Sequence, residues 1–132
     1  MSFEIAVQSA VYTALTGHAP LVALVTGIRD AVEQDTAYPY VTIGEDAHVE
    51  DDTDDRGARD CTITIHVWSR YRGRKDTKQI QGEIYNALHR ANLSHSGYVF
   101  TDSHFLSSDS FMDSDGRTRH GVQTFRILIR SI

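Results

Sequence analysis

The sequence is poor in cysteine and proline and has no long apolar run. Its 132 residues include one cysteine, Cys61, and two prolines. A single cysteine excludes an internal disulfide and is typical of proteins that work in a reducing cytoplasm. No apolar run approaches the roughly 20 residues that a membrane-spanning helix needs, so we expect no membrane contact. Glu4 and Gln8 interrupt the N-terminal segment and no basic residues lead it, so we expect no secretory signal.

The sequence also lacks common catalytic motifs. It contains no phosphate-binding glycine loop, because Gly73 and Gly82 stand alone, and no nucleophile elbow of the form Gly-x-Ser-x-Gly. No pattern predicts catalysis or a bound cofactor. We therefore expect that the protein is not an enzyme and that it acts through assembly.

The composition is that of an ordinary globular domain with one acidic segment. Hydrophobic residues make up 40% and charged residues 23%, and the length fits a single domain over residues 1–132. The net charge of −5 lies within residues 46–60, where seven acidic residues face only Arg56 and Arg59. The remaining chain is neutral. Such a balance does not favour broad attraction to nucleic acid.

The clearest secondary-structure pattern lies in residues 61–91. Apolar and polar residues alternate over 61–69, which indicates a half-buried strand, and the period becomes helical from Asp76. We expect the Asp76 carboxylate to cap this helix by accepting from backbone N–H groups of its first turn. The apolar face of the strand consists of Ile63, Ile65 and Val67. The apolar face of the helix consists of Ile80, Ile84 and Leu88.

The other predicted elements surround this unit. We expect a first helix from its cap at Ser2 to Gly17, and a turn between the last two strands at 113–116, where Asp-Gly favours a hairpin. The remaining predictions are a short helix at 21–25 and strands at 28–33, 40–44, 98–106 and 121–132. This order predicts an α+β fold, with an antiparallel or mixed sheet and two main helices packed on one face.

Two charged segments are candidate contact surfaces. Residues 46–60 have few apolar side chains, so we expect a mobile acidic loop. Residues 70–78 form a basic turn, which could pair with the acidic loop of the same or a neighbouring chain. Trp68 could belong to a core on the second sheet face or anchor a subunit contact. The candidate interface residues are Trp68, Arg70, Arg72, Arg74, Lys75, Asp51, Asp52, Asp54 and Asp55.

Two alternative functions start from other residues. A small metal-binding domain or metal-dependent enzyme could use His104 and His120, which we expect to meet across the last hairpin, together with loop aspartates. The aspartates near 52 and 113 lack the closing Glu of a calcium loop. A nucleic-acid-binding module could use the basic turn 70–78 with its neighbouring aromatic residues, although a solvated turn fits the neutral body better.

Three stretches, in this order and spacing, resemble a known family. They are residues 39–45 (PYVTIGE), residues 66–69 (HVWS) before a basic turn and a helix, and residues 115–126 (DGRTRHGVQTFR). The chain is similar over nearly its whole length to the small tail-completion proteins of long-tailed phages and of gene transfer agents. That family is not enzymatic, so the resemblance carries over no catalytic residues.

The resemblance implies a tail terminator. Such proteins form a homo-oligomeric ring, generally a hexamer, on the head-proximal end of the tail tube. The ring stops growth of the tube and contacts the head–tail connector, or stopper, protein. DNA passes through the lumen without specific binding, and the protein is made in the cytoplasm of the bacterial host. With this role we expect edge strands and the basic turn at subunit contacts.

Overall fold

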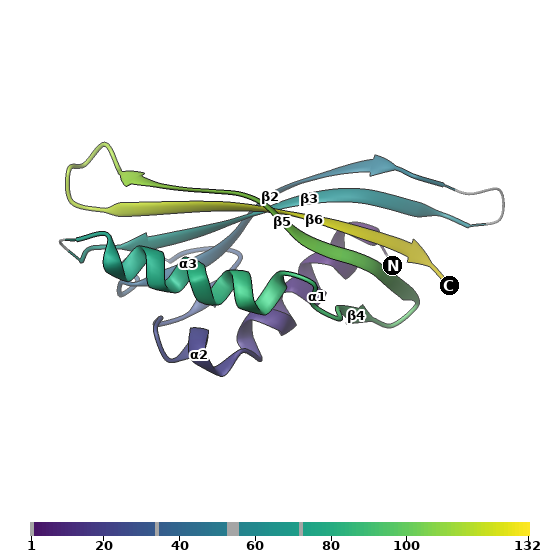
Figure 1. Cartoon of the computed structure of the whole chain (residues 1–132), viewed down its shortest axis with the longest axis horizontal. Coiled ribbons are helices and arrows are strands. Elements are labelled where there is room, and N and C mark those ends of the chain that lie inside the picture. Colours follow the sequence, from purple (N-terminus) through teal and green to yellow (C-terminus); the bar gives the residue numbers. More distant parts are fainter. Residues whose placement is uncertain (1, 34, 53–55, 72) are drawn as a thin grey trace.

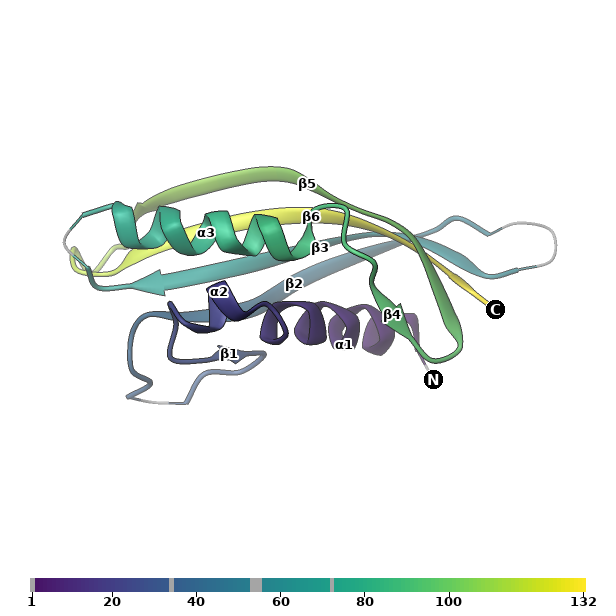
Figure 2. The ribbon, with the colours of Figure 1, turned by 60° about the horizontal axis from the view of Figure 1, so that its bottom comes forward.

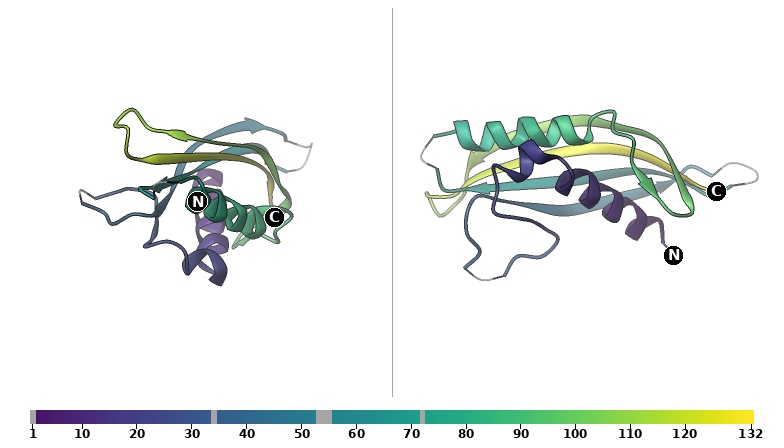
Figure 3. Two further views of the ribbon diagram at one scale, coloured as in Figure 1. Left: turned by 60° about the vertical axis from the view of Figure 1, so that its left-hand side comes forward. Right: turned by 90° about the horizontal axis from the view of Figure 1, so that it is seen from below.

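The computed structural model describes residues 2–33, 35–52, 56–71 and 73–132. A six-stranded sheet carries the helices on one of its faces (Figures 1 and 3). The strand order is β1-β2-β3-β6-β5-β4, and all neighbouring pairs are antiparallel except β1–β2. The elements are α1 (Phe3–Thr16), α2 (Ala19–Val22), β1 (Ile28–Arg29), β2 (Tyr40–Glu50), β3 (Ala58–Ser69), α3 (Lys75–Leu88), β4 (Ser94–His95), β5 (Tyr98–Met112) and β6 (Arg119–Ser131). The predicted α+β class, with helices on one face, is confirmed.

The core lies between the sheet and helices α1 and α3. The two central strands, β3 and β6, alternate buried and half-buried side chains along their length. Their buried face carries the predicted row of β3, and it packs beneath the predicted apolar row of α3. The buried residues of these two rows are Ile63, Ile65, Val67, Ile80, Ile84 and Leu88. None of the helices that the structure describes is long and apolar enough to cross a membrane.

The helix ends differ in part from the predictions. Ser2 caps α1 as expected, since its hydroxyl accepts from the Ile5 N–H at 3.0 Å. The prediction that Asp76 caps α3 is wrong. Arg74 occupies the N-cap position of α3, and Asp76 lies within the first turn. The Asp76 carboxylate instead accepts from the Ser69 hydroxyl at 2.6 Å, which ties the end of β3 to the start of α3.

The acidic segment 46–60 is not a loop along its whole length. β2 continues to Glu50 and β3 begins at Ala58, so both flanks of the segment form a paired hairpin arm. The composition of the segment did not predict this pairing, because the pairing depends on a strand that is distant in the sequence. β6 pairs with the other edge of β3, with Ala58 opposite Arg130. Residues 53–55 lie outside the described residues, so mobility within the segment stays a prediction.

The hairpin between β5 and β6 confirms the predicted turn. The Gly116 N–H donates to the Asp113 carbonyl at 3.0 Å, and Gly116 has φ +70°, a left-handed conformation that favours glycine. β5 is longer than predicted and runs to Met112. The paired strands therefore continue up to the turn, with Met112 opposite Arg119.

Candidate subunit and partner interface

The acidic and basic segments lie at opposite ends of the sheet. The β2–β3 connection is at one end of the long axis, and the β3–α3 connection and the β5–β6 turn are at the other (Figures 1 and 2). β3 has 12 residues, so at roughly 3.3 Å per residue its two ends lie about 40 Å apart. The two charged segments therefore do not pair within one chain. The predicted pairing of the basic turn with the acidic segment of a neighbouring chain stays a prediction.

The basic end is built around Arg70. Its guanidinium lies over the Tyr38 ring, 4.5 Å from the centroid, and its Nε donates to the Thr118 hydroxyl at 3.4 Å. The nearby Asp115 accepts from the Thr118 hydroxyl at 2.7 Å and from two backbone N–H groups, which lowers the pKa of Asp115 to about 2. These contacts order the turn beside Arg70. Arg74 and Lys75 are exposed at the start of α3.

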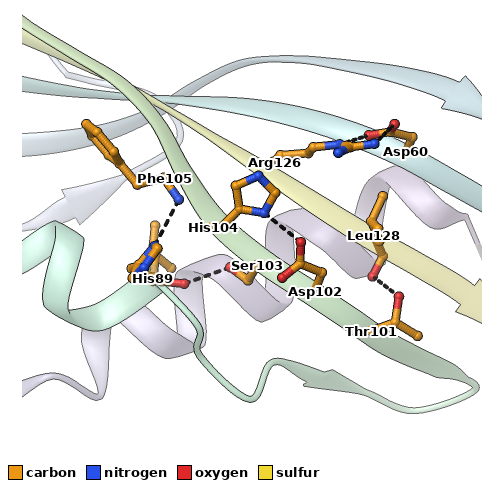
Figure 4. A network of polar contacts seen from close by, with 10 residues as sticks. Asp60, His89, Thr101, Asp102, Ser103, His104, Phe105, Arg126 and Leu128 are labelled. Carbon is orange, nitrogen blue, oxygen red and sulfur yellow. Dashed lines mark hydrogen bonds and ion pairs between the residues drawn. The ribbon is translucent and has the colours of Figure 1, made fainter.

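The acidic end is partly neutralised within the chain. The Asp52 carboxylate accepts from the Ala58 N–H at 2.9 Å, which closes the hairpin arm. The Arg126 guanidinium donates to Asp60 at 2.8 Å, and this bond lowers the pKa of Asp60 (Figure 4). Glu50 and Asp51 are exposed. Of the candidate interface residues, Asp54, Asp55 and Arg72 lie outside the described part of the chain, so the structure does not place them.

Trp68 lies on the sheet face that carries no helix. Its ring stacks on His120 with centroids 3.8 Å apart, and its indole N–H donates to the Thr42 hydroxyl at 3.1 Å. Trp68 is half-buried, and it is not part of the core that the helices cover. It belongs to a ring cluster on the helix-free face, formed by Tyr38, Tyr40, His66, Trp68, Phe111 and His120. A role for Trp68 in a subunit contact stays a prediction.

Two histidines of the ring cluster share a hydrogen bond. His66 Nδ1 lies 2.7 Å from His120 Nε2, and His66 Nε2 lies 2.9 Å from a Glu45 carboxylate oxygen. The hydrogen bond with His66 lowers the pKa of Glu45. Burial, and then the neighbouring charge of His66, lower the pKa of His120. Sequence reasoning missed this pair, because the contact depends on the register that places Trp68 opposite His120.

The fluorescence of Trp68 should report the protonation of His120. Since the pKa of His120 is lowered on folding, the neutral form stabilises the fold above about pH 6.5, and that stability is lost as pH falls toward the folded pKa. Protonated imidazole quenches indole emission, and Trp68 is the single tryptophan. We expect the emission of the folded protein to fall on acidification with a midpoint below 6.5. The distant His104→Gln variant should keep the transition. A midpoint at or above 6.5, or loss of the transition in His104→Gln, contradicts this assignment.

The predicted meeting of His104 and His120 is wrong. His104 stands opposite Arg126 in the β5–β6 pair and its Nδ1 lies 2.6 Å from Asp102, whereas His120 stands opposite Phe111 farther along the hairpin (Figure 4). The long extension of β5 separates them. Among the described residues no group of three His, Cys, Asp or Glu side chains is placed to hold a metal ion.

The chain matches the family model described as "Tail completion protein gp17" over residues 9–130. The chain belongs to this family. It is 27% identical over 126 residues to the tail completion protein gp17 of Bacillus phage SPP1, covering 96% of this chain and 93% of the relative. Its fold is similar to a chain in the virion of a native gene transfer agent particle, with a TM-score of 0.87, 25% identity and 94% of each chain covered. The structure of bacteriophage SPP1 gp17 gives a TM-score of 0.64 at 26% identity, covering 96% of this chain and 88% of that one.

Membership in the tail completion family confirms the resemblance seen in the sequence. The matched region contains all three motif stretches and both charged ends of the sheet. Family members are structural components of phage or gene-transfer-agent particles. The protein therefore has a structural role in a tail of this kind, in association with other particle proteins.

Proposed function

We propose that this tail completion protein is a tail terminator, a homo-oligomeric ring of six subunits that caps the head-proximal end of a tail tube. The ring stops tube growth and joins the tube to the head–tail connector protein. The observation that carries this proposal is the placement of opposite charge at the two ends of one long sheet. Exposed Glu50 and Asp51 mark one end, and exposed Arg74 and Lys75 mark the other.

A ring of identical subunits needs this kind of arrangement. Each subunit must present two different surfaces that fit each other, so that every contact is head-to-tail and the rotation closes. Complementary charges at such contacts accelerate encounter and fix the register of the partners. Because the acidic and basic ends lie about 40 Å apart by strand length, the exposed charges at the two ends of one subunit would pair with those of its two neighbours.

Removal of the gene from the producing host tests the proposal. Without a terminator, tubes have no stop signal and heads have no tail to join. We expect DNA-filled heads without tails, together with free tails of variable and increased length, in electron micrographs. Expression of the wild-type protein in the same host should restore joined particles. Tails of normal length attached to heads in the absence of the protein would overturn the proposed function.

A further inference from the structure

The basic end of the sheet contains a hollow between the β3–α3 connection and the β5–β6 turn. It has a volume of about 310 Å³ and is lined by Arg70, Tyr71, Met112, Gly116 and Arg117. Two of these residues expose much of a large side chain, Tyr71 at 56% and Met112 at 40%. Arginine, tyrosine and methionine are enriched in protein–protein interfaces relative to the rest of the surface. The composition of the hollow is therefore that of a contact site.

The walls of the hollow are held by contacts within the chain. On one wall, the Tyr71 N–H donates to the Ser69 hydroxyl at the end of β3, at 3.1 Å. On the other wall, the Asp113 N–H donates to the Thr118 carbonyl at 2.7 Å and closes the turn. Arg70 joins the two walls, because its Nε donates to the Thr118 hydroxyl. A site that is ordered in advance costs less conformational entropy to fill.

The acidic end of the sheet forms a projecting arm. β2 and β3 stay paired up to Glu50 and Arg59, and this hairpin extends past the helices (Figures 1 and 2). Val49 lies on the arm at 66% exposure, next to the exposed Glu50 and Asp51. A single exposed valine is common on protein surfaces. Here, however, the apolar side chain and two carboxylates share a segment that reaches away from the body of its own chain.

We propose that the hollow receives Val49 of a second copy of this chain, with Glu50 and Asp51 of that copy at its basic rim. The valine packs against the exposed parts of Tyr71 and Met112, and the contact removes apolar surface of both copies from water. The inference rests on the proposed ring, and it names the apolar contact through which neighbouring subunits join.

Charge selects a second copy as the occupant. Arg117 in the wall of the hollow is exposed, as are Arg74 and Lys75 at the start of α3. The arm brings the opposite charge on Glu50 and Asp51, and such complementarity orients the partners and disfavours wrong ones. Within one chain the arm lies about 40 Å from the hollow by strand length, so an arm that fills the hollow belongs to another copy.

Val49→Thr tests the apolar contact without changing any charge. Threonine keeps the branched shape and the strand preference of valine but replaces a methyl group with a hydroxyl. Because Val49 is exposed in the single chain, we expect an unchanged melting temperature. The control Val22→Thr makes the same change at an exposed valine of α2.

Capping of purified tail tubes measures the effect. Each protein is mixed with tubes at the concentration at which wild type caps half of the ends, and capped ends are counted by electron microscopy. We expect Val49→Thr to cap at least fivefold fewer ends than wild type and Val22→Thr to cap as many.

Disulfide formation on tubes identifies the occupant of the hollow. Val49→Cys and Met112→Cys are combined in one chain, where they stand at opposite ends of the sheet, so a disulfide between them requires two copies in contact. Native Cys61 does not compete, because it is buried and burial raises the pKa of its thiol to about 12. After oxidation we expect covalent multimers from this pair, and at least fivefold fewer from the control pair Val49→Cys and Val22→Cys.

The outcomes separate the contact from the ring. Reduced capping by Val49→Thr but not by Val22→Thr, together with multimers specific to the Val49–Met112 pair, supports the contact. Equal capping by both threonine variants, or equal multimers from both cysteine pairs, overturns the contact and leaves the ring in place. Loss of capping in Val49→Thr without pair-specific multimers assigns Val49 to the tube and also overturns the contact. Failure of the wild-type protein to cap tubes overturns the proposed function, and the inference with it.

Discussion

Replacing Ile84 with alanine is expected to lower the free energy of unfolding by about 2–5 kcal/mol. Ile84 is fully buried and lies in the apolar row of α3 that faces the sheet. Truncation removes apolar burial and leaves a cavity between α3, α1 and the central strands, which the packed layers can only partly fill. Urea denaturation followed by far-UV circular dichroism measures the change.

The exposed residue Asn86 provides the matched control on the same helix. Asn86→Ala alters the solvent side of α3, so we expect a change within about 0.5 kcal/mol. A loss below about 0.5 kcal/mol for Ile84→Ala would place this row of α3 outside the core and contradict the described packing.

Reversing the charge of the basic end should abolish ring formation without weakening the fold. In the double variant Arg74→Glu, Lys75→Glu, both changes fall at the start of α3, where negative charge interacts favourably with the helix dipole. We therefore expect an unchanged or slightly higher melting temperature. Like charges would meet across every subunit contact, and we expect capping of tail tubes to fall about tenfold or more.

The acidic end supplies the complementary variant. Glu50→Lys with Asp51→Lys reverses exposed charges and spares Asp52, whose carboxylate closes the hairpin arm. Alone, this variant should also fail to cap. An equimolar mixture of the two variants should restore capping, because alternating subunits place opposite charges at every contact of an even-numbered ring. If each variant fails to cap tubes alone and the mixture fails as well, the two ends do not contact each other.

Much of the fold follows from local sequence pattern. The alternation around Ile63 and Ile65 and the helical row through Ile84 predicted β3 and α3 because each element buries one face against a neighbour. The cap at Ser2 and the turn at Gly116 were predictable because specific backbone geometry requires these residue types.

The features that depend on register were not predictable. The acidic flank of β2 forms a strand because β3 and β6 hold it, which composition does not reveal. Asp76 does not cap α3 because Ser69, brought near by the end of β3, donates to its carboxylate. The histidine pair of the ring cluster likewise arises from strand order. The candidate interface was therefore predictable as two charged segments, but not as opposite ends of one sheet.

The most direct test of the terminator role is the growth of tail tubes in the presence of the purified protein. Tube protein is allowed to polymerise, the wild-type protein is added during growth, and tube lengths are measured by electron microscopy at intervals. A terminator ring predicts that elongation stops at addition and that a ring of subunits appears at one end of each tube. Continued elongation at the rate of untreated tubes, with no ring at either end, would contradict the account.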